Sequence, residues 1–402
     1  MRPAYSPADL DVGIVHDWMP VVAGAERVVQ QMAAVFPKSR VYTLFDFLSE
    51  DERRALLGNR PVEVSRLNSL PGVRRYYRYL LLQCTRAIEE FDVTGHDVVL
   101  SSSAALAKGV ITSPDQLHMA YVHSPARYAW DLTHEYINEL GGVAAGLKRR
   151  AARAMMHRFR LWDMRTVAQV DQYVANSEFI RRRIWKTWRR EARVIYPPVD
   201  TSAFGLGEKP KEEFYFTASR MVPYKRIPLI VEAFTRRPHL RLVVSGDGPE
   251  MEKVRAAAGP NVTLLGHAPF EVMRDHMQRA RGFVFAARED FGIVPVEAQA
   301  CGTPVIALGH AGTAETVRDL SMDDPTGVWF HDQTVEDLGA AIDRMEANLD
   351  AFTPEACRAN AMRFTVERFR EELAEHVGAS LNGPREAPAP ERSWSLPATV
   401  RA

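Results

Sequence analysis

Two glutamates eight residues apart, Glu289 and Glu297, enclose the sequence Asp-Phe-Gly-Ile-Val-Pro-Val. The apolar run 282–287 predicts a buried strand before them, and Pro295 suits the first turn of a helix, which tolerates proline. The amides of residues 292–294 would then lie at a helix N-terminus, which carries partial positive charge and binds phosphate. The two carboxylates would accept hydrogen bonds from hydroxyl groups, one from a sugar and one from a ribose. Taken alone, the pair also fits a surface loop with solvated glutamates.

Two cations in the same half of the chain strengthen the phosphate interpretation. Arg220 and Lys225 lie in Ser-Arg-Met-Val-Pro-Tyr-Lys, directly after a predicted strand at 214–219. Cations at the carboxyl end of a strand can neutralise a diphosphate. Each would be a solvated surface charge if it stood alone, but together with the glutamates they favour a nucleotide-diphosphate site.

The first half of the chain offers a glycine and a histidine in comparable places. Gly24 lies after the first predicted strand and just before a helix that should begin near Glu26, where a glycine lets the backbone approach a phosphate. His123 follows the strand 118–122 and opens the sequence His-Ser-Pro-Ala-Arg-Tyr-Ala-Trp-Asp. A lone histidine would more simply be satisfied by backbone groups. The dense polar and aromatic surroundings favour a functional histidine here.

Alternating short apolar strands and amphipathic helices predict the α/β class. The predicted strands are 12–16, 41–44, 97–101, 118–122, 170–175 and 194–196 in the first half, and 214–219, 240–245, 262–265, 283–286, 305–308 and 328–330 in the second. We expect two Rossmann-like, doubly wound domains facing one another across a cleft, with ligands beyond the carboxyl ends of the strands. Pro197 and Pro198 divide the chain. The predicted parts are an acceptor domain at 1–197, a donor domain at 198–370, and a helix end with a disordered tail at 371–402.

Composition limits the other possibilities. The 402 residues include 51 basic and 51 acidic side chains, and this balance argues against a nucleic-acid binder. The three cysteines have no metal-binding spacing and indicate a reducing, cytoplasmic location. We expect no signal peptide, because the first ten residues are polar, and no apolar run approaches the roughly 18 residues that cross a bilayer. We therefore expect only peripheral contact with the cytoplasmic face of an inner membrane.

The motifs taken together resemble glycosyltransferase family 4, of GT-B fold, from about Asp11 to about Glu371. The closest-looking branch is the mannosyltransferases that assemble bacterial exopolysaccharide and O-antigen repeats. The motifs are His16-Asp-Trp, Gly24-Ala-Glu, His123 to Asp131, Asn176-Ser, Tyr196-Pro-Pro-Val-Asp, Arg220 to Lys225, Gly246-Asp-Gly-Pro, and Glu289 to Glu297.

The resemblance implies a role for each matching residue. Arg220 and Lys225 would bind the donor diphosphate and stabilise the leaving nucleotide. Glu289 would bind the sugar hydroxyls and Glu297 the ribose, while His123 would contact and position the transferred sugar. Other donor contacts would come from Gly24, Gly248, His267, Phe291, Gly292, Ile293 and Val294. Acceptor contacts would come from Asp17, Arg127, Tyr128, Trp130 and Asp131.

The implied reaction is a retaining transfer of a hexose from a nucleotide-diphosphate sugar, with GDP-mannose favoured by the branch. The acceptor would be a glycan, linked in similar enzymes to a polyprenyl diphosphate. No metal is expected, because no Asp-x-Asp follows a strand and two cations already serve the phosphates. Two basic, aromatic stretches, Val73–Leu82 and Leu147–Trp162, fit either solvated helix faces or docking on an anionic membrane.

Several alternatives were weighed against this interpretation. A nicotinamide-dependent oxidoreductase lacks support, because Gly246-Asp-Gly supplies only two of the three glycines of the dinucleotide motif, and no P-loop is present. A UDP-sugar donor, a GT-B-shaped epimerase or phosphorylase and a non-catalytic binder remain open. Related sequences have paired glycines at two loops where this chain has Ala23 and Ala311.

Overall fold

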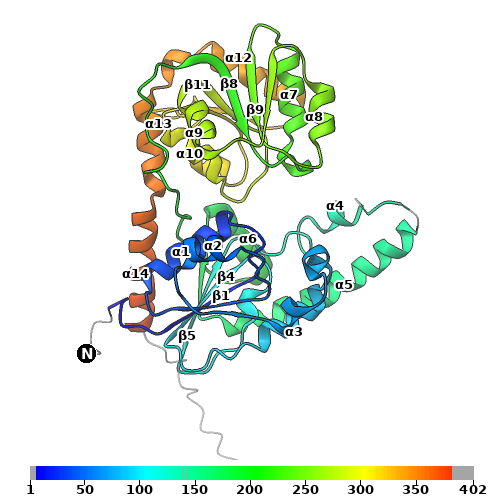
Figure 1. The fold of residues 1–402 in the computed structure, drawn as a ribbon, viewed down its shortest axis with the longest axis vertical. Coiled ribbons are helices and arrows are strands. Elements are labelled where there is room, and N and C mark those ends of the chain that lie inside the picture. Colours follow the sequence, from blue (N-terminus) through cyan, green and yellow to red (C-terminus); the bar gives the residue numbers. More distant parts are fainter. Residues whose placement is uncertain (1–5, 139, 143, 383–402) are drawn as a thin grey trace, which may run out of the picture.

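The computed structural model describes residues 6–138, 140–142 and 144–382, which form two α/β domains joined end to end (Figure 1). The sheet of the first domain has seven parallel strands in the order β3-β2-β1-β4-β5-β6-β7. Its strands are β1 (Val12–His16), β2 (Arg40–Thr43), β3 (Val62–Val64), β4 (Val98–Ser103), β5 (Leu117–Val122), β6 (Gln172–Ala175) and β7 (Arg193–Val194). The order reverses between β1 and β4, as in a doubly wound sheet.

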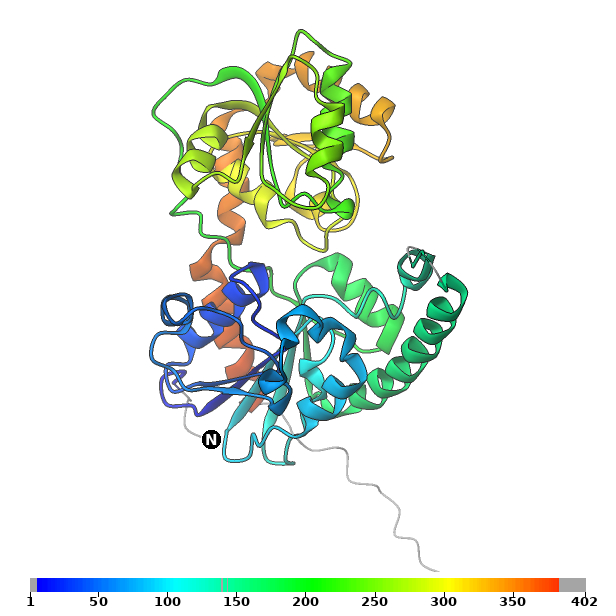
Figure 2. The same cartoon turned by 45° about the vertical axis from the view of Figure 1, so that its right-hand side comes forward.

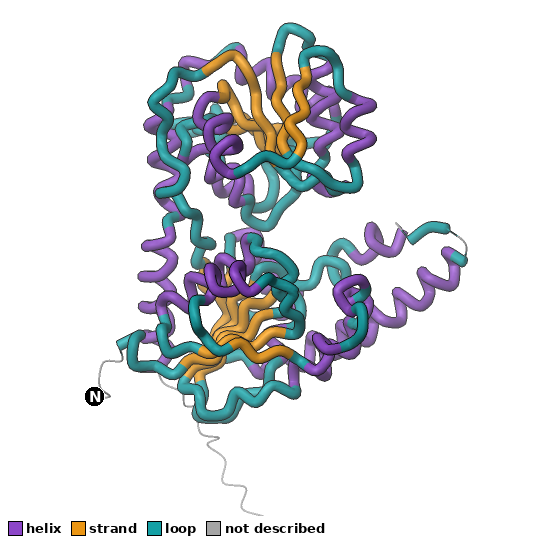
Figure 3. Tube along the Cα trace, in the orientation of Figure 1, coloured by secondary structure: helices purple, strands orange, loops and turns teal. Residues whose placement is uncertain are grey.

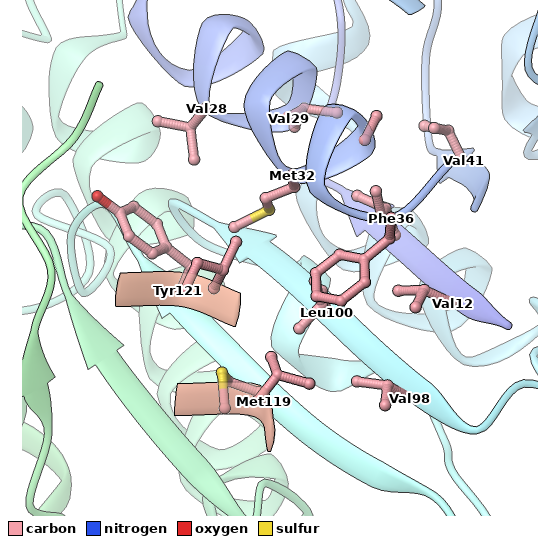
Figure 4. Packing of buried hydrophobic residues seen from close by; sticks show 14 of the residues in the cluster. Val12, Val28, Val29, Met32, Phe36, Val41, Val98, Leu100, Met119 and Tyr121 are labelled. Carbon is pink, nitrogen blue, oxygen red and sulfur yellow. The ribbon is translucent and has the colours of Figure 1, made fainter. Parts of the chain in front are cut away.

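The central strands of this sheet are covered on both faces, and every residue of β1, β4 and β5 is buried. Helix α1 (Gly24–Val35) packs one face onto the sheet, and the buried residues of that face recur at helical spacing. Figure 4 shows Val28 and Met32 of this helix above Leu100 and Tyr121 of the strands. Burial of this apolar stripe is what holds the start of α1 at the sheet's carboxyl edge.

Among the remaining helices of the first domain, one long helix projects outward from the domain. They are α2 (Glu50–Leu57), α3 (Leu81–Glu89), α4 (Thr133–Asn138), α5 (Ala145–Thr166) and α6 (Glu178–Trp188), with short turns η1 (Arg66–Ser69), η2 (Val73–Arg75), η3 (Tyr77–Tyr79), η4 (Ala107–Gly109) and η5 (Val167–Gln169). Met156 and Phe159 anchor the second half of α5 in the domain core. The first half of α5 projects outward with α4, as Figures 1 and 2 show.

The second domain repeats the same plan with six parallel strands, in the order β10-β9-β8-β11-β12-β13. These are β8 (Glu212–Ala218), β9 (Arg241–Ser245), β10 (Val262–Gly266), β11 (Ala280–Phe285), β12 (Val305–Leu308) and β13 (Gly327–Phe330). Its helices are α7 (Ile227–Thr235), α8 (Met251–Ala257), α9 (Phe270–Arg279), α10 (Ile293–Ala300), α11 (Thr313–Thr316), α12 (Val335–Glu346) and α13 (Pro354–Ala361), with turns η6 (Pro223–Lys225), η7 (Leu349–Ala351) and η8 (Met362–Phe364). Figure 3 shows each sheet enclosed by helices.

These sheets confirm the predicted α/β class and the two Rossmann-like domains. Each of the twelve predicted strands is present, and β3 is an additional edge strand. The basic stretch at 73–82 differs from expectation, since it forms two 3₁₀ turns and the start of α3 rather than one helix. Val73, Tyr77 and Leu81 are buried in the domain core, so most of this stretch is structural.

The last helix, α14 (Val366–Asn382), leaves the second domain and packs against the first (Figure 1). Phe369, Leu373, Val377 and Leu381 belong to the same core as β1 and α1. Their spacing of four residues gives one apolar stripe along the helix. Residues 371–382 are therefore part of the first domain's core, whereas 383–402, predicted to be disordered, lie outside the described residues.

The two alanines at paired-glycine positions differ in conformation. Ala23 has φ −135°, which any residue adopts, so its loop does not need a second glycine. Ala311 has φ 59°, in the left-handed region that favours glycine, and it is buried. The departure from the family pattern therefore strains the backbone at Ala311 only.

Candidate active site

The loops that carry several predicted site residues follow the strands at which the order of each sheet reverses. In the second domain these strands are β8 and β11, and their loops carry Lys225 and Glu289. In the first domain they are β1 and β4, and the loop after β1 leads to Gly24. Ligands of doubly wound sheets bind at this reversal, outside the carboxyl ends of the strands. The topology thus brings together residues about 65 positions apart in sequence.

Lys225 and Glu289 form an ion pair across the two loops of the second domain. The Lys225 ammonium also lies over the Phe285 ring, at 5.2 Å from its centroid, and over the Tyr224 ring, at 5.3 Å. These contacts hold the two predicted donor-binding residues at a single place. Arg220 differs, because it is exposed and its guanidinium has no ion-pair partner among the residues that the structure describes.

Two glycines after β9 support the loop that carries Arg220. Gly248 has φ 153°, and a Cβ at this position would lie 2.6 Å from the carbonyl oxygen of Met221. At Gly246, with φ 132°, a Cβ would lie 1.8 Å from the carbonyl oxygen of Ser219. Only glycine allows such an approach, which lets the Met221 amide donate to the Asp247 carbonyl at 2.9 Å. The glycines therefore fix the position of the Arg220 loop.

Helix α10 begins at this site as predicted from the sequence. Gly292 precedes its first residue with φ 87°, a conformation that favours glycine. Ile293 and Val294 are half-buried in its first turn, and their amides lack partners within the helix. Phe291 is different, because its ring is buried in the core, at 5.3 Å from the Phe364 ring.

Glu297 lies one turn further along α10 and is buried. Burial raises the pKa of its carboxyl to about 7, and the nearby Arg27 of the first domain partly opposes this rise. A carboxyl with such a pKa changes charge near neutral pH and can donate as well as accept a hydrogen bond. The predicted ribose-binding residue is thus desolvated before any ligand arrives.

His267 is the most peripheral of the predicted donor residues. It is exposed and follows β10, whose last residue, Gly266, accepts a hydrogen bond from the Gly246 amide at 2.7 Å. The loops after β9 and β10 are therefore joined, and His267 lies on the same carboxyl edge of the sheet as Arg220.

Residues from the first domain close this site from the opposite side. A Cβ on Gly24 would lie 2.8 Å from Cδ1 of Ile293, so the first turns of α1 and α10 are in contact. Arg127 forms an ion pair with Asp290, and its Nε donates to the same carboxylate at 3.1 Å. Arg183 of α6 also faces Asp290, at 3.7 Å. The carboxyl edges of the two sheets therefore face one another.

His123 lies directly after β5 on this edge. Its Nε2 is 2.8 Å from the Ser102 hydroxyl, and its ring meets the Tyr121 and His16 rings edge to face. Burial, together with His16, lowers the pKa of His123 to about 3. The imidazole is therefore neutral at physiological pH.

The structure gives the predicted acceptor residues contacts within the protein. Asp17 is buried, and its two oxygens accept four backbone amides, from residues 104–107, at 2.6–2.9 Å. The Trp130 indole donates to the buried Asp163, which also pairs with Lys108. These two residues support loops of the first domain through these contacts.

The other residues of the predicted acceptor loop also have partners within the protein or are enclosed by it. The hydroxyl of Tyr128 is buried and has no hydrogen-bond partner in the described part of the chain. Asp131 is exposed but forms an ion pair with Arg183. Together with the Arg127 contact described above, these positions make the loop a connection between the domains.

Three interdomain residues were missed by the sequence reasoning, namely Asp290, Arg183 and Glu315. Asp290 joins the domains through Arg127 and Arg183, yet it looked like an ordinary loop residue. The Glu315 carboxylate of α11 accepts the amides of Glu178 and Phe179, at 2.8 Å each, and so caps α6 of the other domain. The only signal in the sequence was the position of Asp290 inside the glutamate motif.

The described residues contain neither a metal-ligand cluster nor a helix that could span a membrane. No group of three or more His, Cys, Asp or Glu side chains in residues 6–138, 140–142 and 144–382 is placed to hold a metal ion. In the same residues, no helix has the length and apolar character needed to span a bilayer. That the reaction needs no metal stays a prediction.

Two family models match consecutive parts of the chain. The model described as Glycosyltransferase Family 4 matches residues 22–203, and the model described as Glycosyl transferases group 1 matches residues 199–363. These regions correspond to the two parallel sheets and to the loops between them.

Curated relatives and solved structures show the same similarity. The D-inositol 3-phosphate glycosyltransferase of Mycobacterium marinum is 27% identical over 206 residues, covering 45% of this chain and 43% of the relative. The protein of that name from Geodermatophilus obscurus is 29% identical over 238 residues, covering 51% of this chain and 52% of the relative. The chain thus spans about half the length of the curated relatives it matches.

Solved structures match over most of the chain. Anabaena Alr3699/HepE in complex with UDP has a TM-score of 0.67 at 16% identity, covering 92% of this chain and all of that one. Sucrose-phosphate synthase from Thermosynechococcus elongatus has a TM-score of 0.66 at 16% identity, covering 92% of this chain and 98% of that one. At such identity these structures establish the fold. With both domains matched in order by family models and the GT-B architecture present, the chain belongs to glycosyltransferase family 4.

Proposed function

We propose that the protein transfers a hexose from a nucleotide-diphosphate sugar to a hydroxyl of a glycan acceptor, with retention of the anomeric configuration. The observation that carries this proposal is the meeting of Lys225, Glu289 and the first turn of α10 at one sheet edge. A cation, a carboxylate and free amides at one place suit a molecule that has a diphosphate next to sugar hydroxyls.

The proposed mechanism is a front-side substitution. The bond from the anomeric carbon to the donor phosphate oxygen breaks, and the acceptor oxygen bonds to the same face of that carbon. The acceptor proton passes to the departing phosphate oxygen, so no protein base is needed. Arg220, Lys225 and the α10 amides would stabilise the charge that develops on the leaving diphosphate. Lys225 must then exchange part of its contact with Glu289 for the phosphate.

The donor is proposed to be GDP-mannose, on the resemblance of the motifs to the mannosyltransferase branch. The alternative is a UDP-sugar, supported by the UDP bound in the similar Anabaena structure. A thermal-shift series with GDP-mannose, UDP-glucose and ADP-glucose separates them, because a ligand at 100 times its Kd stabilises the folded state by about 2.7 kcal/mol. A rise with UDP-glucose but not with GDP-mannose would reject the mannose assignment.

Turnover tests the proposal as a whole. The protein is incubated with the stabilising donor and with extracted lipid-linked or free oligosaccharides, and the product's anomeric configuration is read by NMR. Transfer with retention is expected. A changed sugar with no acceptor added would indicate an epimerase instead, and a bound but unchanged donor would indicate a non-catalytic binder.

The acceptor is proposed to be linked to a polyprenyl diphosphate at an anionic membrane, reached through the projecting half of α5. Leu147 is 71% exposed there, and Arg150 and Arg153 are exposed beside it. Basic residues near such a surface contribute about 1 kcal/mol each. We expect Arg150→Glu/Arg153→Glu to reduce sedimentation with anionic vesicles at low salt. Equal sedimentation of the unmodified protein with neutral and anionic vesicles would reject membrane docking.

A further inference from the structure

Three polar residues lie side by side on the carboxyl edge of the first sheet. They are His16 at the end of β1, Ser102 in β4 and His123 after β5. His16 and Ser102 are buried and paired in register. The His16 Nδ1 lies 3.1 Å from the Ser102 hydroxyl oxygen and 3.1 Å from the Ser102 carbonyl oxygen, while that hydroxyl is 2.8 Å from Nε2 of His123.

The hydrogen on His16 follows from the carbonyl contact. A carbonyl oxygen only accepts hydrogen bonds, so His16 must carry its hydrogen on Nδ1 and donate it. Its Nε2 then has only a lone pair, and this atom is buried with no partner among the described residues. His16 therefore donates to Ser102 and cannot accept from it.

Only one side-chain acceptor remains for the hydrogen of the Ser102 hydroxyl. Ser102 is fully buried, and a buried hydroxyl donates its hydrogen where an acceptor is within reach. The two side-chain partners of this hydroxyl are His16, which is a donor, and Nε2 of His123. The hydroxyl thus donates to His123 Nε2, which must be free of hydrogen. Since His123 is neutral, its hydrogen lies on Nδ1.

We propose that Ser102 and His16 are positioning residues that fix His123 as an Nδ1–H donor toward the transferred sugar. The proposal rests on the proposed transferase function, because it names what the His123 ring does there. His123 Nδ1 has no protein partner in the described part of the chain, so this hydrogen is available to a sugar oxygen. His123 then holds the sugar by donation, and neither ring nitrogen is free to take the acceptor proton.

The adjacent residue supplies a matched control. The Ser101 hydroxyl contacts Nε2 of His118 at 2.9 Å, between the same two strands, and both residues are buried. Successive side chains of a strand point to opposite faces of the sheet, so this second serine–histidine pair lies away from Ser102. Ser101→Ala and Ser102→Ala remove the same kind of bond, and only the second touches His123.

The first measurement reads the tautomer without any need for activity. In protein labelled with ¹⁵N in histidine, NMR distinguishes a ring nitrogen that carries hydrogen from one that does not. We expect His123 to carry it on Nδ1, and Ser102→Ala to shift the ring toward the Nε2–H form, while Ser101→Ala leaves His123 unchanged. An unmodified protein with hydrogen on Nε2 of His123 would overturn the proposal.

The second measurement is a kinetic cycle with the donor and acceptor that support turnover. Ser102→Ala should lower kcat about tenfold, with little change in the donor KM, and should have no further effect in a His123→Ala background. Ser101→Ala should retain the wild-type kcat. Equal losses from Ser102→Ala with and without His123 would reject the positioning role. Absence of turnover with every donor would instead count against the proposed function, and the NMR result would still decide the tautomer.

Discussion

Replacing Asp290 with asparagine should open the two domains without unfolding either one. Asp290→Asn keeps the size of the side chain and removes the charge that Arg127 and Arg183 share from the opposite domain. The Asp290 side chain is 11% exposed and that of Arg127 is 27% exposed, so this pair is shielded more than a surface ion pair. The contact therefore belongs to the interface and to neither domain core.

The free energy lost in Asp290→Asn depends on which hydrogen-bond partners Arg127 and Arg183 keep. Hydrogen bonds to charged groups contribute about 1.5–3 kcal/mol, whereas exposed ion pairs contribute about 0–1 kcal/mol. Arg183 keeps Asp131 as a partner, so most of the loss falls on Arg127. An asparagine oxygen can still accept one bond. We estimate a loss of about 2 kcal/mol in favour of the domain contact, which is about a thirtyfold change in the equilibrium.

Small-angle scattering and donor kinetics measure this shift. Asp290→Asn should increase the radius of gyration and raise the donor KM, up to about thirtyfold, because binding must close the domains again. The control is Asp343→Asn, which removes the Arg237–Asp343 pair inside the second domain, where two bonds measure 2.7 Å. If Asp290→Asn scatters like the wild type and keeps its donor KM, the contact does not hold the domains together and the reasoning fails.

Three further changes test separate parts of the site. Arg220→Ala should lower turnover about 10²–10³-fold while the free energy of unfolding stays within about 0.5 kcal/mol, because the guanidinium is exposed and unpaired within the described chain; a large loss of stability in urea unfolding would contradict this. Burial raises the pKa of Glu297 from its ordinary 4.5 to about 7, so the protonated form stabilises the fold below pH 4.5 and this contribution disappears as pH rises through about 7. Glu297→Gln should therefore flatten unfolding free energy against pH in that window, and an unchanged profile would show that the carboxyl is not desolvated. Ala311→Gly should stabilise the protein by about 0.5–1 kcal/mol, since it relieves a φ of 59° at a small cost in chain entropy, and denaturant unfolding that shows a loss would mean the alanine is not strained.

The sequence predicted the strands well because each is a short apolar run with clear boundaries. The doubly wound class also followed from the alternation of strands and helices, and it predicted ligands beyond the carboxyl ends of the strands, where Lys225 and Glu289 lie. Glycine positions were informative for the same local reason, since Gly292 has a φ that favours glycine. Local signals of this kind survive in the sequence because neighbours in the chain produce them.

The contacts of the predicted acceptor residues within the protein could not be predicted, because they come from residues distant in the sequence. Asp17 binds amides almost ninety positions away, and Trp130, in a turn, binds Asp163 of helix α5. A loop rich in polar and aromatic side chains looks the same in sequence whether it meets a substrate or its own protein. Burial separates the two cases, and burial depends on the completed fold.

The chain crosses between the domains twice, and the place of these crossings explains how contacts at the interface can affect the arrangement of the two domains. The amide of Val199, on the way out, donates to the carbonyl of Phe364, on the way back, at 2.9 Å, and Val199 pairs with Thr365. Helix α14 then continues into the first domain's core. Because both crossings lie side by side, the second domain can turn about one short segment while each core stays intact. Contacts away from that segment, those of Asp290 and Glu315, then join the two domains on the side of the carboxyl edges.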